Sequence, residues 1–300
     1  MRKPDFFIVG APKCGTTALY RFLSQHPEIF LPKVKEVHFF GSDLYLPGYV
    51  PDTEKYLRLF ANARDETRVG EASVWYLYSK VSAAEIKHFA PEASILIMLR
   101  NPVDMIHSLH SQLQYVGVER IKGFESAVEN PRRSVRLWND PRVINGVTYR
   151  DVGKYSHQVL RYLNAFGPDN VKIIIFDDFE NSPLLAFQET CKFLGVNPHF
   201  EPAISVVNQN KQVRSKIVQS IVAHPPTVAS KLLRRLTTTS EREEIIKWMR
   251  RLNTRYLPRV PIRHDLRNRL QEDFKPDVER LSKLLNRDLT QWCGPPTLNI

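Results

Sequence analysis

The chain of 300 residues has 42% hydrophobic and 10% aromatic residues, enough for a packed core, and a net charge of +11. No window approaches the roughly 18 unbroken apolar residues of a membrane span, and the apolar run over 6–9 is too short for a signal peptide. Its cysteines, Cys14, Cys191 and Cys293, show neither metal-ligand spacing nor a disulfide framework. We therefore expect a cytoplasmic protein without structural disulfides.

Predicted strands and helices alternate along most of the chain. Apolar runs predict strands over 6–9, 69–72, 94–99 and 171–176. Helical patterns predict helices over 16–25, 102–116, 155–166, 184–194 and 277–285. The segments over 117–150 and 199–215 are predicted loops, and basic helices are expected after them. This alternation predicts an α/β protein, with a central parallel sheet covered by helices on both faces, in a single domain over 1–300.

A strongly basic segment runs from Lys231 to Arg269, with twelve Lys or Arg and four Asp or Glu. Such a segment is either a solvated helical surface or a face for anionic ligands or an anionic membrane. The chain has no zinc-finger spacing, RNP-like aromatic motif or basic zipper, so nucleic acid is not an expected partner.

The segment FFIVGAPKCGTTALYRFL, residues 6–23, predicts a strand, a glycine-rich turn and a helix. Such a unit directs backbone N–H groups and a positive helix end at an anion, and Gly15 permits close approach. The spacing is that of the loop G-x-x-x-x-G-K-[ST], but Thr16 replaces its lysine and Lys13 stands three residues earlier. Thr16 and Thr17 add hydroxyl donors. One lysine suits a phosphosulfate better than a nucleoside triphosphate with its metal.

Other polar residues follow the predicted strands, where ligands of parallel sheets bind. They are Glu71–Ser73, Arg100–Asn101 and Asp177–Asp178. The paired aspartates could hold a metal ion, but a capped turn is the favoured interpretation.

Taken together, these motifs resemble the sulfotransferases that use 3′-phosphoadenylyl sulfate (PAPS). PKCGTT resembles their 5′-phosphosulfate loop, and LRNPVDMIHSLH resembles their 3′-phosphate motif, with Arg100 at a strand end and Ser108 eight residues later. IIIFDDFENSP and FKPDVERLSKLLNRDLTQW are similar to later segments of the family. The motifs stand in family order over 6–292. The resemblance implies a P-loop-like three-layer α/β/α fold, PAPS as co-substrate and no metal.

The resemblance also implies roles for the matching residues. The 5′-phosphosulfate would be held by the loop residues Lys13, Cys14, Gly15, Thr16 and Thr17. Cys14 is expected to be a small filler, and Lys13 to stabilise charge on the sulfuryl group. Arg100 and Ser108 would hold the 3′-phosphate, because a planar guanidinium suits phosphate oxygens.

One family feature is missing from the chain. Heparan-sulfate-type members close a Lys-Gly-Arg loop over the cofactor, and no such sequence stands near the C-terminus. The candidate replacements are Lys211, Arg214, Arg255 and Arg259, among which the sequence does not choose.

A general base is the next requirement, since an attacking hydroxyl must lose its proton. KEVHFF, residues 35–40, resembles the Glu-x-His-Phe-Phe segment of heparan-type members, whose glutamate is the base, and Glu36 matches it. The cytosolic small-molecule branch uses a histidine instead, which makes His107 and His110 rivals. We favour Glu36.

Two further residues are candidates for the acceptor side. His38 would share a strand face with Glu36 if this segment is extended, and would bind the acceptor or orient Glu36. Glu71, in GEASVWY, is predicted to bind the acceptor or support the site, with a core salt bridge as the equal alternative.

The predicted function is in-line transfer of a sulfuryl group from PAPS to an acceptor hydroxyl, giving a sulfate ester and adenosine 3′,5′-bisphosphate (PAP). A glycan, a glycolipid or a small-molecule alcohol fits as acceptor. The basic segment suggests an anionic or membrane-associated acceptor and a peripheral place at the membrane. A P-loop kinase, and a non-catalytic protein that binds polyanions or membranes, are the alternatives.

Overall fold

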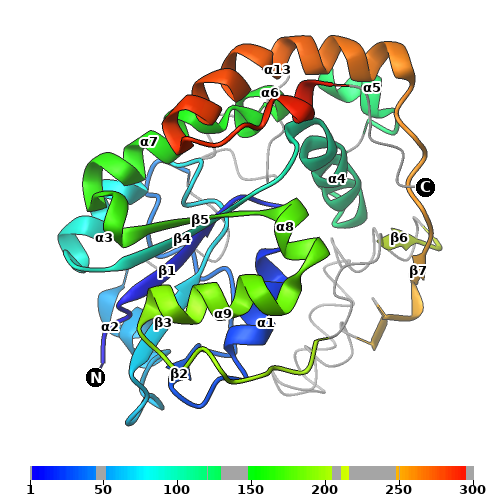
Figure 1. Ribbon diagram of the computed structural model, residues 1–300. Helices are drawn as coiled ribbons and strands as arrows, with labels where there is room; N and C mark the ends of the chain where they lie inside the picture. Colours follow the sequence, from blue (N-terminus) through cyan, green and yellow to red (C-terminus); the bar gives the residue numbers. More distant parts are fainter. Residues whose placement is uncertain are drawn as a thin grey trace.

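The computed structural model describes residues 2–44, 52–119, 121–129, 148–204, 211–215, 248–249 and 251–294. Five parallel strands form its central sheet, in the order β2-β3-β1-β4-β5 (Figure 1). They are β1 (Phe6–Gly10), β2 (Ile29–Phe30), β3 (Arg68–Ala72), β4 (Ser94–Leu99) and β5 (Val171–Ile175). Every residue of β1 and β4 is buried, as expected for central strands covered on both faces.

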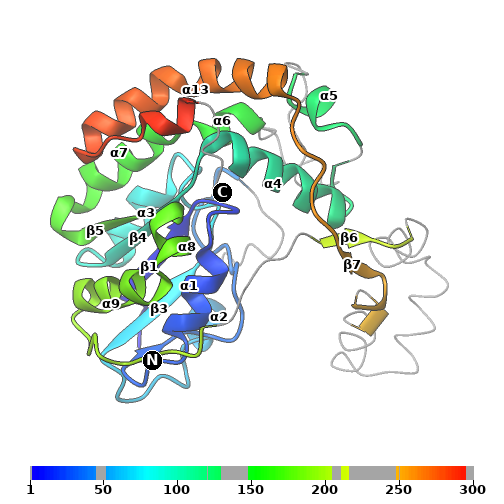
Figure 2. The same ribbon diagram turned by 45° about the vertical axis from the view of Figure 1, so that its right-hand side comes forward.

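Helices cover both faces of the sheet (Figures 1 and 2). On one face, α1 (Thr16–Leu23) and α9 (Pro183–Leu194) pack on the sheet and on each other. On the other, α7 (Tyr155–Phe166) packs on β4 and β5, with α3 (Ser82–Phe89) beside it and α13 (His264–Leu285) across its outer side. This arrangement confirms the predicted three-layer α/β/α fold with a parallel sheet.

The remaining elements connect these layers. They are the helices α2 (Thr53–Arg58), α4 (Pro102–Tyr115), α5 (Phe124–Val128), α6 (Tyr149–Gly153) and α8 (Phe176–Asn181), the 3₁₀ turns η1 (Pro168–Asn170) and η2 (Thr290–Cys293), and the strands β6 (Lys211–Val213) and β7 (Thr254–Tyr256). None of the helices in the described ranges combines the length and apolar character needed to cross a membrane.

Local signals in the sequence explain several element boundaries. β4 has the predicted bounds, and the predicted helix after it is α4. Asn101 caps α4, because its Oδ1 accepts from the Val103 amide at 3.0 Å, and Pro102 occupies the first turn, where its missing N–H costs nothing. α9 ends at Gly195, whose φ of 68° lies in the left-handed region that glycine adopts without strain.

Three loop or strand predictions were wrong in part. The predicted loop over 117–150 contains α5 and the start of α6, and that over 199–215 contains β6, which pairs antiparallel with β7. β5 stops at Ile175, and Phe176 opens α8. Short elements of this kind depend on tertiary partners rather than on their own periodicity.

The last helix is longer than predicted. α13 begins at His264 rather than at 277 and carries Pro276 in its interior. A proline normally ends a helix, but buried side chains on both sides of Pro276 hold α13 against α7. These are Leu266, Leu270, Phe274, Val278 and Leu281. Most of the basic helices expected before it, including 216–247, lie outside the described residues.

Candidate active site

The loop between β1 and α1 lies at the carboxyl edge of the sheet, between the ends of β3 and β4. Gly15 begins α1 with a φ of 90°, and a Cβ added there would fall 2.9 Å from Cδ2 of Phe176. Only glycine fits this position, since both the backbone angle and the close ring exclude a side chain. Lys13 also has left-handed backbone, with a φ of 62°, and its Nζ donates to Oε1 of Gln112 on α4 at 3.3 Å.

The side chain of Cys14 points away from the loop surface. Its buried Sγ lies 3.4 Å from the Pro12 carbonyl oxygen and 3.9 Å from Oη of Tyr155. Burial raises the pKa of this thiol to about 12, so it is not a nucleophile at neutral pH. Any contact of Cys14 with an anion must come from its backbone N–H. Thr16 is buried at the start of α1, and Thr17 is half-buried.

A cluster of two arginines and a serine lies where β4 leads into α4. The guanidinium of Arg100 lies over the ring of Phe176, 4.4 Å from its centroid. Nη2 of Arg259 donates to Oγ of Ser108 at 2.9 Å. Burial lowers the pKa of Arg259, and the charge of nearby Arg100 lowers it further. Within the described residues, the buried Nε of Arg259 has no hydrogen-bond partner. Two neighbouring cations with a spare donor form a site for an anion.

The structure therefore distinguishes among the four basic candidates for the missing loop. Among the candidates whose side chains the structure describes, Arg259 contacts Ser108. Arg214 is exposed and its Nε donates to the Thr254 carbonyl at 3.3 Å, on the β6–β7 pair. Lys211 lies in β6, and its side chain is outside the described part of the chain.

Glu36 lies at the end of β3, on the other side of the phosphate loop from Arg100. Its N–H donates to the Ala72 carbonyl at 2.9 Å, and its Oε2 accepts from the Val74 amide at 3.0 Å. Lys35 donates to its Oε1 at 2.5 Å. The side chain is 32% exposed, so the carboxylate is fixed in place while an acceptor can still reach it.

His38 approaches Glu36, but not by the predicted route. Both residues have left-handed backbone, with φ of 63° for Glu36 and 53° for His38, so the segment is not extended. A tight turn brings Nε2 of His38 to 3.9 Å from Oε2 of Glu36. Burial lowers the pKa of His38, and its buried Nδ1 has no hydrogen-bond partner among the described residues. The ring therefore lies where it can orient Glu36 through Nε2, while Nδ1 is shielded from the surface.

Glu71 is completely buried behind this turn. Its carboxylate accepts from Oη of Tyr56 at 3.2 Å, Oγ of Ser73 at 2.5 Å and Oη of Tyr76 at 3.0 Å. Burial raises the pKa of Glu71 to about 7. The described residues give it no cationic partner, so the core salt bridge was the wrong alternative. Nor is the carboxylate exposed to a molecule at the surface, as the predicted direct contact with an acceptor would require.

The rival histidines face α5 rather than the end of β3. Their rings lie 4.8 Å (His107) and 5.6 Å (His110) from the ring of Phe124. Nε2 of His110 lies 3.0 Å from the Ile121 carbonyl oxygen. Burial, followed by the charge of Arg259, lowers the pKa of His107 to about 4. Their packing gives both rings a structural role.

A family model described as the sulfotransferase domain matches residues 3–222, which is most of the chain. The chain belongs to the sulfotransferase family. This membership overturns the kinase alternative. A crystal structure of a sulfotransferase from Alicyclobacillus acidocaldarius is similar to it, with 33% sequence identity, a TM-score of 0.73, and coverage of 97% of this chain and 99% of that one.

The curated relatives of this chain are larger proteins. Human bifunctional heparan sulfate N-deacetylase/N-sulfotransferase 3 is 29% identical over 211 residues, covering 66% of this chain and 23% of its own length. Rat carbohydrate sulfotransferase 15 is 25% identical over 252 residues, covering 65% of this chain and 44% of its own. The chain thus spans less than half the length of either.

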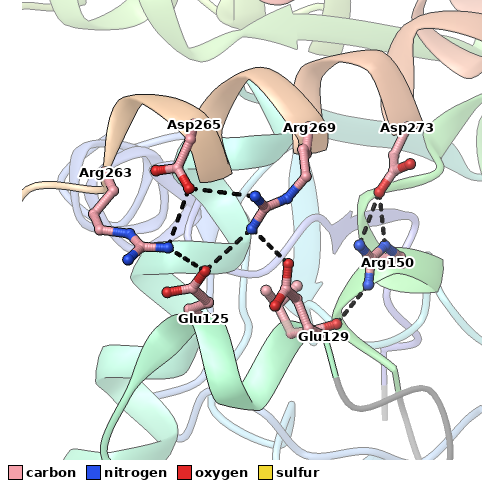
Figure 3. A network of polar contacts seen from close by, with 8 residues as sticks. Glu125, Glu129, Arg150, Arg263, Asp265, Arg269 and Asp273 are labelled. Atoms are coloured by element: carbon pink, nitrogen blue, oxygen red, sulfur yellow. Dashed lines mark hydrogen bonds and ion pairs between the residues drawn. The ribbon is translucent and has the colours of Figure 1, made fainter.

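The last part of the basic segment, residues 263–269, is neutralised by carboxylates. Arg263 and Arg269, before and on α13, pair with Glu125 and Glu129, on and just after α5 (Figure 3). The pairs include Arg263–Glu125, Arg267–Asp104 at 2.6 Å, and Arg269–Glu129 at 2.7 Å. These arginines are paired with carboxylates of neighbouring helices, which contradicts a free basic face at 263–269. Residues 231–247 lie outside the described part of the chain.

The paired aspartates after β5 have structural partners. Asp178 accepts from both Nη atoms of Arg287, at 2.6 and 2.8 Å, and Asp177 accepts from Nε1 of Trp292 at 3.1 Å. Both carboxylates dock the C-terminal turn onto α8. The favoured capped-turn interpretation was wrong in its detail, because the aspartates lie in the first turn of α8 and no side chain caps that helix. No group of three or more His, Cys, Asp or Glu within the described ranges could hold a metal ion.

Sequence reasoning missed one residue beside the loop. Gln112, the partner of Lys13, lies four residues after Ser108 on α4. Residues four apart share a helix face, so Ser108 could have pointed to Gln112.

Proposed function

We propose that the protein transfers a sulfuryl group from PAPS to the hydroxyl of an acceptor. One observation carries the proposal: the order β3-β1-β4 places Glu36, the phosphate loop and the Arg100–Ser108–Arg259 cluster in a row along one edge of the sheet. This order matches PAPS with a bound acceptor. The cluster would hold the 3′-phosphate, the loop would hold the 5′-phosphosulfate, and Glu36 would face the acceptor at the sulfuryl end.

The 3′-phosphate site is the part whose chemistry is clearest. A phosphate monoester is dianionic at neutral pH and offers three acceptor oxygens. Arg100 and Arg259 supply two guanidinium groups, and Ser108 supplies a hydroxyl. The buried Nε of Arg259, which lacks a partner in the described structure, provides a further donor. The residues therefore fit the group.

The loop residues would bind the other end of the co-substrate. When bound, PAPS supplies a sulfuryl group on a phosphate leaving group. Backbone N–H groups at Gly15 and the hydroxyls of Thr16 and Thr17 donate to the 5′-phosphate. Lys13 would neutralise charge that develops on the bridging oxygen. Fixing both ends holds the sulfur in place, so attack becomes effectively intramolecular.

Glu36 would remove the proton of the acceptor hydroxyl. The Val74 amide and Lys35 hold its carboxylate, and Nε2 of His38 lies beside it. The other carboxylate nearby, Glu71, is too buried to take this proton directly. The geometry thus favours Glu36 over His107 and His110, whose rings pack on α5.

We further propose a glycan or glycolipid acceptor. The names of the curated relatives, heparan sulfate N-sulfotransferase and carbohydrate sulfotransferase, favour a sugar hydroxyl or amine. Exposed apolar side chains in the segment from Trp248 to Val260, which precedes α13, favour an acceptor with a lipid part and a peripheral place at the membrane. They are Trp248, Leu252, Tyr256, Leu257 and Val260. Three unpaired cysteines support a reducing, cytoplasmic compartment.

A thermal-shift comparison tests the proposal. PAP should raise the melting temperature without metal, because a ligand that binds only the folded state stabilises it. ATP with Mg²⁺, and heparin, should have smaller effects. Release of PAP from PAPS is then measured with heparosan, chondroitin, octyl glucoside and p-nitrophenol as acceptors. A shift with ATP and Mg²⁺ but none with PAP contradicts the proposal.

A further inference from the structure

Two hydroxyl groups connect the buried Glu71 to the turn that carries Glu36. Oγ of Ser73 donates to Oε1 of Glu71 at 2.5 Å and accepts from the His38 amide at 3.2 Å. The Ser73 hydroxyl therefore links the buried carboxylate of Glu71 to the backbone of His38, two residues after Glu36.

Tyr76 makes the second bridge. Its Oη donates to Oε2 of Glu71 at 3.0 Å and accepts from the amides of Phe39, at 2.9 Å, and Phe40, at 3.3 Å. A hydroxyl has one hydrogen to donate. Because that hydrogen is directed at Glu71, the lone pairs of the oxygen remain available for the two amides. An ionised carboxylate, which only accepts, fixes this direction in both bridges.

The turn needs such an anchor because its backbone is unfavourable. Glu36 and His38 have φ of 63° and 53°, in the left-handed region that residues other than glycine rarely adopt. Backbone of this kind persists only where surrounding contacts hold it. The described contacts within 36–40 include the bonds of Glu36 to Ala72 and Val74 and the hydroxyl bridges to the three amides that follow.

We propose that Glu71 is a positioning residue, whose carboxylate orients the hydroxyls of Ser73 and Tyr76 so that they hold the turn over 36–40 and, with it, Glu36. The part concerning turnover rests on the proposed function, in which Glu36 is the base. The anchoring itself does not, because it concerns only the hydrogen bonds of the turn.

Glu71→Gln would break this pattern with almost no change in shape. The amide nitrogen of glutamine donates, so one of its neighbouring hydroxyls could no longer give its hydrogen in that direction. Tyr76→Phe removes one bridge outright. Tyr56→Phe is the matched control: Oη of Tyr56 also donates to Glu71, but the ring stacks on Phe39 at 4.0 Å and remains in the variant.

Hydrogen–deuterium exchange of the amides over 38–40 tests the anchoring. Loss of one hydrogen bond should speed exchange about fivefold in Glu71→Gln and Tyr76→Phe, and leave Tyr56→Phe close to the wild type. Wild-type protection in both test variants overturns the proposal. So does equal loss in Tyr56→Phe, which would assign the effect to general packing. If Glu71→Gln does not fold, Ser73→Ala takes its place.

Turnover provides the second measurement. The rate constant kcat for release of PAP from PAPS should fall about tenfold or more in Glu71→Gln, because a displaced base loses its alignment. The Kd of PAP should stay within about twofold, since its 3′-phosphate cluster lies beyond β1, at the end of β4. A matched fall in PAP affinity overturns the proposal. A wild type that transfers no sulfuryl group contradicts the proposed function, while amide exchange still decides the anchoring.

Discussion

Arg259 donates to Ser108 at 2.9 Å, although 151 positions separate the two residues along the chain. The bond joins the segment before α13 to α4 and brings a second guanidinium to Arg100. A cluster assembled from such distant parts gives the first prediction.

Arg259→Ala should weaken PAP binding about 10- to 100-fold, because a charge-assisted hydrogen bond contributes about 1.5–3 kcal/mol. The Kd is measured by isothermal titration calorimetry. Arg255→Ala removes the same charge from an exposed position of strand β7 and should weaken PAP binding much less. Equal losses in the two variants would show that overall charge, rather than the Ser108 site, controls affinity.

Glu36→Gln should lower kcat about 10²- to 10⁴-fold, the usual contribution of a general base, because glutamine cannot accept the acceptor proton. The variant keeps an oxygen that can accept from the Val74 amide, so the turn should remain folded. Affinity for PAP serves as the control and should be unchanged. Near-normal turnover would assign the proton transfer to another group.

Gly15→Ala should destabilise the protein by about 2–5 kcal/mol and abolish PAP binding, since it adds left-handed strain and a clash with Phe176 at 2.9 Å. Gly195→Ala is the matched control. Gly195 has a φ of 68° but no atom within 4 Å of an added Cβ, so it should cost only about 1 kcal/mol. Urea denaturation measures both. Equal costs would refute the close packing of the loop.

Stability should depend on pH through Glu71. Burial raises its pKa from 4.5 to about 7, so the folded protein binds this proton more tightly than the unfolded chain. The stabilisation is complete below pH 4.5 and is lost as the pH rises through about 7. Glu71→Gln cannot titrate. The free energy of unfolding of the wild type, relative to the variant, should therefore fall by up to about 3 kcal/mol over this range.

Denaturation of both proteins at a series of pH values checks this sign. The charges of other groups cancel in the difference, apart from neighbours of Glu71 such as Tyr56, Tyr76 and Glu36. If the difference in free energy of unfolding between the two proteins stays constant with pH, the pKa of Glu71 is not raised. The ionised form, which orients the hydroxyls of Ser73 and Tyr76, predominates above about pH 7, where the turn over 36–40 should be held best.

The exposed ion pairs between the α5 region and the start of α13 should contribute little to the free energy of unfolding, despite their number (Figure 3). Arg263 is 63% exposed and its partner Glu125 is 34% exposed, so Glu125→Gln should cost no more than about 1 kcal/mol and less at high salt. Arg267 is only 18% exposed in its pair with Asp104. Asp104→Asn should therefore cost more, about 1–3 kcal/mol. A larger loss in Glu125→Gln would reverse this order.

The elements that sequence predicted well carry their own signals. β4 is an unbroken apolar run, α4 begins with a capping asparagine and a proline, and α9 ends at Gly195. Elements such as α5 and β6 were missed because they are short and are stabilised by packing or pairing with distant segments. The predicted helix over 277–285 covers only the end of α13, which continues through Pro276 because its buried face outweighs the proline.

The sequence by itself determined the parallel α/β fold and the glycine-rich turn between β1 and α1, because both follow from local patterns of apolar residues and glycines. It also identified Arg100, Ser108 and Glu36 as candidates. Only the tertiary structure singled out Arg259 among the basic residues near the C-terminus, and placed Glu71 in the interior among hydroxyl groups. Long-range contacts of this kind depend on which surfaces pack together, and the residue pattern within one segment does not predict that packing.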